Sequence, residues 1–233
     1  MTDFIIGLAK IILVNLILSG DNAVVIALAC RNLHPSLQNK AIFWGSFGAI
    51  GLRVILTFVA VWLLQIPFVE LLGSLLLIWI AVKLLAGEEE NDDINGGSNL
   101  REAIKTIIVA DLVMSLDNVV AVAGAADGNI LLILIGLAIS IPLIIWGSQL
   151  LMKLMQRFPI IVTIGAALLG YTSGEMIMGD DIVGTQLESV WAGFEHLLPI
   201  VLAVVVVVLG KWIEAHKEKQ KNAPIVREIH GDL

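Results

Sequence analysis

Residues 15–29 read NLILSGDNAVVIALA, and residues 111–125 read DLVMSLDNVVAVAGA. The two stretches share a serine, an aspartate and an asparagine in the same register, at an offset of 96 residues. The identical pairs are Ser19 and Ser115, Asp21 and Asp117, and Asn22 and Asn118. Asn15 corresponds to Asp111 at the same offset. Both copies lie in the middle of long apolar segments, where an ionised carboxylate is costly and needs a partner or a function. We interpret the two copies as the halves of one buried cation site.

The composition indicates a membrane protein. Of the 233 residues, 58% are hydrophobic and 15% are charged, whereas soluble domains contain about a quarter charged residues. The mean hydropathy is +0.93. The single cysteine, Cys30, excludes an internal disulfide framework and a cysteine-rich metal site. The composition predicts no nucleic-acid partner, and the formal charge of −7 comes mostly from acidic residues in a few loops.

Apolar segments of about 20 residues can cross a hydrocarbon core about 30 Å thick. The sequence contains seven of them, and each must satisfy its own backbone polar groups in lipid, so helices are expected. The sequence therefore predicts an all-α polytopic membrane protein with seven transmembrane helices and the lipid bilayer as its surroundings. The segments are approximately 4–30, 41–64, 67–86, 102–126, 129–151, 158–177 and 197–214.

The basic residues predict the orientation of the chain. Twelve of the 14 lysines and arginines fall in or beside the first, third and fifth loops and the C-terminal tail, and the second, fourth and sixth loops contain none. The other two, Lys10 and Arg53, lie within apolar segments. By the positive-inside rule, the N-terminus is outside and the C-terminus is in the cytoplasm.

The repeat extends beyond the motif, because three residues of the third segment recur in the sixth. At an offset of 92, Pro67, Gly73 and Lys83 correspond to Pro159, Gly165 and Glu175. An odd number of spans in each half means that the halves face opposite ways, as in the inverted repeats of many transporters. We therefore expect a 3+3 inverted repeat plus one extra helix. The expected parts are repeats at 1–86 and 100–177, an acidic cytoplasmic linker at 87–99, an external loop at 178–196, a seventh helix at 197–216 and a basic cytoplasmic tail at 217–233.

The helical spacing does not place the two motif aspartates on the same helix face as the other polar residues of the motif. Asn15, Ser19 and Asn22 share one helix face, and the second copy repeats this spacing. On an ideal helix Asp21 would lie about 100° away from that face. Either the helix breaks at the motif or each aspartate faces a different neighbour. A glycine at position 20 favours a break in the first copy, and the second copy has no such residue.

The charges within the apolar segments indicate which ligand the cluster takes. Three aspartates and one arginine carry −2 when all are ionised, and one divalent cation would neutralise them. The ligands are hard oxygens and no histidine or cysteine lies mid-membrane, which favours manganese, magnesium or calcium over zinc or copper. The candidate metal ligands are Asp21, Asp117, Asp111, Asn22, Asn118, Ser19, Ser115 and Asn15, with Arg53 as the charge-compensating residue and Glu175 as a candidate gate. The alternative is a buried salt bridge of Asp21, Asp117 and Arg53 that only fixes helix packing.

The paired motifs LSGDN at 18–22 and MSLDN at 114–118, in a seven-span chain, resemble those of the TerC family, which is grouped with the lysine-exporter-like superfamily. The resemblance covers essentially the whole chain. It implies a 3+3 inverted bundle in a bacterial cell membrane and a role in metal-ion homeostasis, since several members are similar to manganese exporters. Carried over by position, the motif acids fall on Asp21, Asp111 and Asp117.

The expected function is export of a divalent cation, most readily Mn²⁺, by alternating access. The sequence contains no Walker-type ATP-binding motif, so a proton gradient is the expected energy source. No cofactor is expected, and the sequence allows an oligomer. Two alternatives stay open: an exporter of amino acids or other cations, and a membrane partner that loads metal into other proteins or assembles with them. An enzyme is not expected, because neither aspartate has the Gly-x-Gly-Asp context of intramembrane aspartyl proteases.

Overall fold

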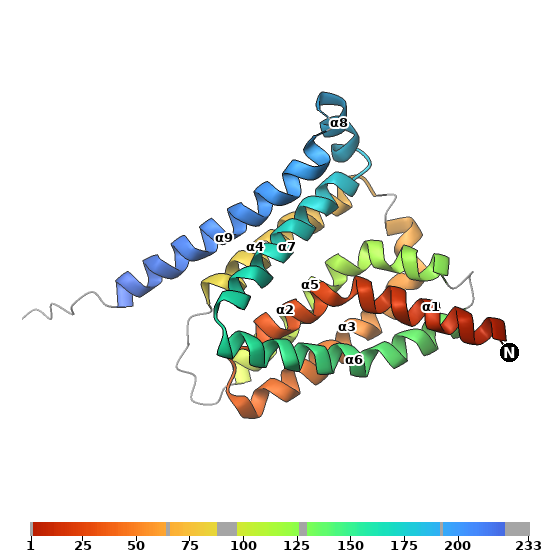
Figure 1. Ribbon diagram of the computed structural model, residues 1–233, viewed down its shortest axis with the longest axis horizontal. Coiled ribbons are helices and arrows are strands. Elements are labelled where there is room, and N and C mark those ends of the chain that lie inside the picture. Colours follow the sequence, from red (N-terminus) through yellow and green to blue (C-terminus); the bar gives the residue numbers. More distant parts are fainter. Residues whose placement is uncertain (1, 64–65, 88–96, 126–129, 192, 222–233) are drawn as a thin grey trace, which may run out of the picture.

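The computed structural model describes the chain except for residues 1, 64–65, 88–96, 126–129, 192 and 222–233. At 2–5, 60–62, 97–98, 117, 119–120, 123–125, 130 and 220–221 it describes the backbone alone. The described residues form helices and no strand, as predicted (Figure 1). The helices are α1 (Thr2–Leu18), α2 (Gly20–Cys30), α3 (Pro35–Leu63), α4 (Val69–Ala86), α5 (Gly97–Ala125), α6 (Ile130–Arg157), α7 (Ile160–Gly179), α8 (Val183–Val190) and α9 (Phe194–Lys221).

Five of these helices are long and apolar enough to cross a membrane within the part of the chain that the structure describes: α3, α4, α6, α7 and α9. The pair α1 and α2 makes a sixth span if the two are taken together. The remaining expected segment, 102–126, coincides with α5 as far as Ala125; this helix has 29 residues and includes several side chains outside the description. The structure therefore establishes a multi-pass membrane protein, and the count of seven stays a prediction.

The two copies of the motif differ in their backbone. The first is broken at Ser19, where α1 and α2 meet at an angle of 48°. The second runs without interruption through α5. A Cβ at Gly20 would meet nothing within 4 Å, so this glycine is not required by space. Its contribution is instead a low helix propensity at the position where the helix breaks.

The helices form two groups (Figure 1). In one group α4, α7 and α9 pack on one another, and in the other α1 and α2 pack with α5 and α6 while α3 packs on α5 and α6. The short helix α2 lies where the groups meet, and it contacts α5, α6 and α7. Its residues 22–28 are all buried, which makes it the centre of the hydrophobic core.

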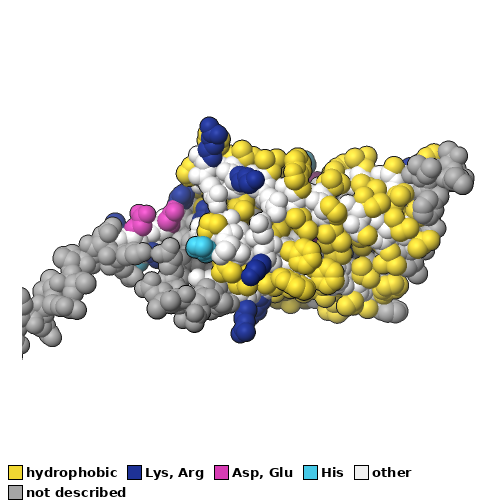
Figure 2. Space-filling view, turned by 90° about the horizontal axis from the view of Figure 1, so that it is seen from below, with side chains coloured by type: hydrophobic (Ala, Val, Ile, Leu, Met, Phe, Trp, Pro, Cys, Tyr) yellow, Lys and Arg dark blue, Asp and Glu magenta, His cyan; other side chains and the backbone are white. Residues whose placement is uncertain are grey.

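The outer surface is apolar over most of its length. Large exposed side chains include Trp44, Phe47, Trp79, Trp146 and Trp212, as expected for helices that face lipid. On the face shown in Figure 2, lysine and arginine side chains gather toward one end and hydrophobic side chains cover the rest. The turn between α2 and α3, the turn between α6 and α7 and the end of α9 lie toward one end of the molecule, and the N-terminus lies toward the other (Figure 1).

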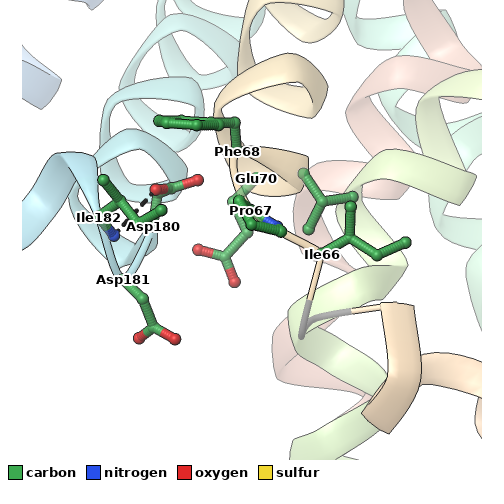
Figure 3. Close-up of a pocket in the computed structure, with 8 residues that line it drawn as sticks. Ile66, Pro67, Phe68, Glu70, Asp180, Asp181 and Ile182 are labelled. Atoms are coloured by element: carbon green, nitrogen blue, oxygen red, sulfur yellow. Dashed lines mark hydrogen bonds between the residues drawn. The ribbon is translucent and has the colours of Figure 1, made fainter.

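An additional helix, α8, lies in the stretch expected to be an external loop. The buried carboxylate of Asp180 holds it against α4. Figure 3 shows the hydrogen bond that Ile182 donates to this carboxylate. One oxygen accepts hydrogen bonds from the amides of Ile182 and Val183, at 3.1 and 3.0 Å, and the other accepts one from Leu71 at 3.3 Å. Asp180 therefore serves both helix N-termini, which is a structural role.

Close packing between α7 and α9 yields a testable prediction. A Cβ at Gly170 would lie 2.8 Å from the carbonyl oxygen of Leu202, and one at Gly174 would overlap the backbone of Pro199. Because backbone atoms cannot rotate away, Gly174→Ala should lower the free energy of unfolding by about 1–3 kcal/mol. The matched control is Gly51→Ala, where a Cβ meets nothing within 4 Å and no loss is expected. Melting temperatures in detergent check both, and equal values would contradict the packing.

Candidate cation site

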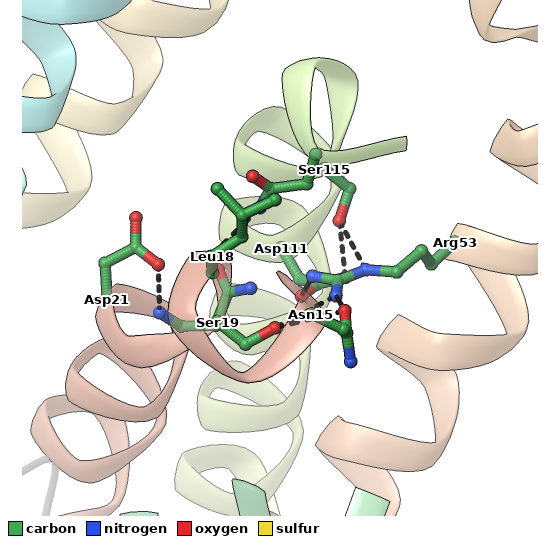
Figure 4. Close-up of polar contacts among 9 residues, drawn as sticks. Asn15, Leu18, Ser19, Asp21, Arg53, Asp111 and Ser115 are labelled. Carbon is green, nitrogen blue, oxygen red and sulfur yellow. Dashed lines mark hydrogen bonds and ion pairs between the residues drawn. The ribbon is translucent and has the colours of Figure 1, made fainter. Parts of the chain in front are cut away.

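The guanidinium group of Arg53, in the middle of α3, connects the two copies of the motif (Figure 4). Its Nη1 atom donates hydrogen bonds to Asn15 Oδ1 at 2.9 Å and to Ser19 Oγ at 3.2 Å. Its Nε atom donates to Ser115 Oγ at 2.9 Å, and Nη2 lies 2.7 Å from Asp111 Oδ1. All three nitrogens of the side chain therefore donate hydrogen bonds, and two of them donate to residues of α5.

This Arg53 network is buried and electrically balanced. Arg53 is 3% exposed and Asp111 is 9% exposed. The second oxygen of Asp111 accepts a hydrogen bond from Ser115 Oγ at 3.1 Å. Since both charges are paired and hydrogen-bonded, the network has no net charge that would attract a cation. Removing either partner would leave a buried charge uncompensated.

The helix break rearranges the hydrogen bonds around Asp21. In an unbroken helix the amide of Asn22 would donate to the carbonyl of Leu18, but here it donates to Asp21 Oδ1 at 2.8 Å. The Leu18 carbonyl instead accepts a hydrogen bond from Asn118 Nδ2 at 3.2 Å. An unsatisfied carbonyl in a membrane costs several kcal/mol. An asparagine of the second copy thus stabilises the break in the first.

Asp21 faces a cavity of about 500 Å³. Figure 4 shows its carboxylate on the opposite side of the α1–α2 chain from Arg53. The cavity lies between the break, α5 and α7, and its polar lining residues are Asp21, Asn118, Thr172 and Glu175. Within the described residues, neither Asp21 nor Glu175 forms an ion pair. Two carboxylates, on α2 and α7, therefore line the cavity without an ion-pair partner among the described residues.

The structure divides the predicted ligands into two neighbouring groups. Asn15, Ser19, Asp111 and Ser115 contact Arg53, and Asp21, Asn118 and the candidate gate Glu175 line the cavity. Asn22 is buried beside Asp21 but does not line the cavity, and its amide atoms have no hydrogen-bond partner in the described part of the chain. Asp117 lies on α5, and its side chain is outside the description. No three histidine, cysteine, aspartate or glutamate side chains converge among the residues described.

Besides apolar residues and Gly20, three lining residues were not among the predicted site residues: Thr172 on α7 and the two methionines Met114 and Met176. Thr172 lies one helical turn before Glu175, a spacing that places both on one face. Met114 directly precedes Ser115 in the second motif. Threonine and methionine are common in membrane helices, so residue type alone does not predict these lining residues. Only their positions near Glu175 and within the second motif could have suggested them.

The comparisons with known proteins agree with this architecture. A model of the "Integral membrane protein TerC family" matches residues 1–218. The chain is 42% identical to the uncharacterized membrane protein YjbE of Bacillus subtilis, over 93% of this chain and 99% of the relative. The uncharacterized membrane proteins YceF and YkoY of the same organism are 25% and 23% identical, over 69% and 74% of this chain and 66% and 60% of their own lengths. No solved structure matches significantly. The chain belongs to the TerC family of integral membrane proteins.

Proposed function

We propose that the protein is a transporter, not an enzyme, that exports a divalent metal cation, with Mn²⁺ as the favoured ion, by proton-coupled alternating access. The observation that carries the proposal is the Asp21 carboxylate, which lies at a helix break and faces a cavity with no neutralising partner among the described residues. A charged group within a membrane span that pairs with nothing is expected to bind an ion or a proton. Broken helices place substrate sites in this way in many transporters.

The charge of the cavity favours a divalent cation. Arg53 neutralises Asp111, so the carboxylates of Asp21 and Glu175 contribute −2 when both are ionised. Carboxylate, amide and hydroxyl oxygens are the donors that hard divalent cations prefer. An amino-acid substrate fits less well, because its carboxylate needs a cation. The buried cation in this region, Arg53, is held by Asp111 and does not line the cavity.

Symmetric packing supports the inverted repeat. Gly45 of α3 faces Ile107 of α5, and a Cβ there would lie 2.6 Å from the isoleucine. Gly136 of α6 faces Ile11 of α1 in the same way, and Ile11 and Ile107 are 96 residues apart, the offset of the motif. Such a pair of matching contacts is what an inverted repeat would produce, and many transporters that work by alternating access are built from such repeats.

Export from the cytoplasm needs an energy source. Moving a divalent ion outward against about 100 mV costs roughly 4.6 kcal/mol. We assign this energy to inward proton movement through the cavity carboxylates, because protons and a metal ion would compete for the same oxygens. The bacterial plasma membrane, which maintains such a gradient, is the proposed location.

The first prediction of this proposal concerns Asp21. Asp21→Asn keeps the shape of the side chain and removes the charge, so Mn²⁺ transport into proteoliposomes should be abolished. The Mn²⁺-dependent rise in melting temperature expected from ligand linkage should also disappear. Asp181→Asn, the same change at an exposed aspartate, is the control and should behave like the parent protein. Normal transport by Asp21→Asn would exclude this aspartate as a ligand.

The second prediction separates the Arg53 network from the cavity. Arg53→Met should lower the free energy of unfolding by about 3–5 kcal/mol, because Asp111 is left buried without a partner. The double variant Arg53→Met/Asp111→Leu leaves neither charge unpaired and should recover most of this loss. A double-mutant cycle on unfolding free energies measures the coupling. Additive losses would show that the two side chains do not depend on each other.

The third prediction concerns orientation. A cysteine replacing Ser98, in the expected cytoplasmic linker, should resist a membrane-impermeant maleimide in intact cells. A cysteine replacing Ser189, which is exposed on α8, should react. The native Cys30 is fully buried and should not contribute. The reverse pattern of labelling would contradict the predicted orientation.

A further inference from the structure

Asn22 is a buried polar residue whose side-chain amide is unpaired within the described part of the chain. It is 3% exposed, and neither Nδ2 nor Oδ1 has a hydrogen-bond partner there. An unpaired amide in a low-dielectric interior costs free energy, and such groups are rare in folded proteins. A partner that Asn22 gains only in a second conformation would account for its presence.

The counterpart of Asn22 in the second copy of the motif has a defined partner. Asn118 Nδ2 donates to the carbonyl of Leu18 at 3.2 Å, next to the break of the first copy. Exchanging the two copies at the offset of 96 residues turns this contact into one from Asn22 to the carbonyl of Met114. That carbonyl lies within the continuous helix α5, where a backbone amide one turn later satisfies it. The Asn22 amide therefore lacks the partner that a break in α5 would supply.

The packing of α4 and α7 against the motif helices also differs between the halves. A Cβ at Gly73 of α4 would lie 3.1 Å from Val113 of α5. The counterpart of Gly73 is Gly165 of α7, and a Cβ there would lie 2.9 Å from Val24 of α2. The counterpart of Val113 is Ile17, which lines the cavity and is 70% exposed, whereas Val113 is 5% exposed. The cavity therefore occupies the position at which α7 lacks the contact that α4 makes.

The contacts at Val113 and Val24 lie on the same side of the motif. Val113 precedes the motif serine of α5, Val24 follows the helix break, and α2 and α5 run in opposite directions (Figure 1). The group of α4, α7 and α9 thus meets the motif helices nearer the α2–α3 turn, and Figure 1 shows the two groups diverging toward the N-terminus. A conformation with the roles of the copies exchanged would bring Gly165 against Ile17 and close the cavity.

We propose that Asn22 is a positioning residue for a second conformation, in which α5 breaks at Ser115, α1 and α2 form one continuous helix, and the Asn22 side chain donates a hydrogen bond to the carbonyl of Met114. This inference rests on the alternating access of the proposed function and does not depend on which ion is carried. Asn118 stabilises the conformation described here, and Asn22 stabilises its counterpart. Asp117 would then take the place at a helix break that Asp21 has here, which accounts for the presence of the motif in both halves.

The test measures the separation of the two helix groups in the full-length protein. Spin labels are attached to cysteines replacing Leu72 of α4 and Leu134 of α6, which are 65% and 40% exposed. Both positions lie near the ends of their helices at which the groups diverge (Figure 1). The native Cys30 is fully buried and should remain unlabelled. A long separation reports the conformation described here, and a short one reports its counterpart.

The two asparagines should respond differently to replacement by leucine. Asn22→Leu removes an unpaired amide, so it should not lower the melting temperature and should keep the long separation at least as populated as in the parent. Asn118→Leu removes the hydrogen bond to Leu18 and should reduce the population of the long separation about tenfold. Since each variant disfavours one of two conformations that transport needs, Mn²⁺ transport into proteoliposomes should fall at least about tenfold in both.

Ser46→Ala is the matched control for Asn22→Leu. Ser46 of α3 is 2% exposed, and its hydroxyl group also has no hydrogen-bond partner among the described residues. It lies outside both copies of the motif, so its replacement should leave separation, melting temperature and transport as in the parent.

Gly20→Ala tests the same exchange without removing a hydrogen bond, and it replaces Asn118→Leu if that variant does not fold. A Cβ at position 20 meets nothing within 4 Å. Alanine favours a continuous helix across the break, so the population of the long separation should fall about fivefold.

Three outcomes would overturn the inference. The first is a melting temperature that Asn22→Leu lowers as much as Asn118→Leu does, because Asn22 would then support the conformation described here. The second is Mn²⁺ transport by Asn22→Leu at the rate of the parent, and the third is a separation that changes in neither Asn118→Leu nor Gly20→Ala. A parent protein that transports no divalent cation overturns the proposed function, whereas the separations and melting temperatures still decide the inference.

Discussion

The buried guanidinium group of Arg53 is the constraint on which the rest of the structure depends. A charge in the middle of a membrane protein must be paired and hydrogen-bonded in every direction, and here the partners come from α1, the Ser19 break and α5. These partners belong to both copies of the motif. The position of α3 relative to the motif helices is therefore set by the directions of the hydrogen bonds that Arg53 makes, in addition to apolar packing, which has no direction in lipid.

The helix break follows from the same arrangement. Once Ser19 and Asn15 are directed toward Arg53, Asp21 lies on another side of the chain and can face α7 (Figure 4). Its carboxylate accepts a hydrogen bond from the amide of Asn22, so this amide does not donate to the carbonyl of Leu18. Asn118 then satisfies that carbonyl. The shared residues of the two motifs thus have different roles in each copy: the first copy contains the helix break, and Asn118 of the second copy stabilises it.

The sequence predicted an all-helical membrane protein, and a glycine in the first copy favoured a helix break at the position where the structure has one. It did not predict that Asp111 would be neutralised while Asp21 would not. That outcome depends on how closely α3 approaches α5. Gly45 and Gly48 permit a close approach, but no local sequence pattern specifies the distance between the two helices. The helix α8 was missed for a similar reason. It is short and polar, and the hydrogen bond that connects Asp180 to α4 joins residues that are 109 positions apart.

The differences between the halves indicate how an inverted repeat would become directional. Lys83 and Glu175 occupy corresponding positions, but Lys83 pairs with Glu102 whereas Glu175 lines the cavity beside Asp21. Two identical halves would present the same charge to both sides of the membrane and would favour neither. With a paired lysine in one half and an acidic residue in the other, a cation is attracted to the side on which Glu175 lies. In the proposed orientation this side is external, and Glu175 would lie near the outer end of the cavity. In the transport cycle that we propose, protonation of Glu175 from that side would weaken its hold on the ion and would thereby link release of the metal to entry of the proton.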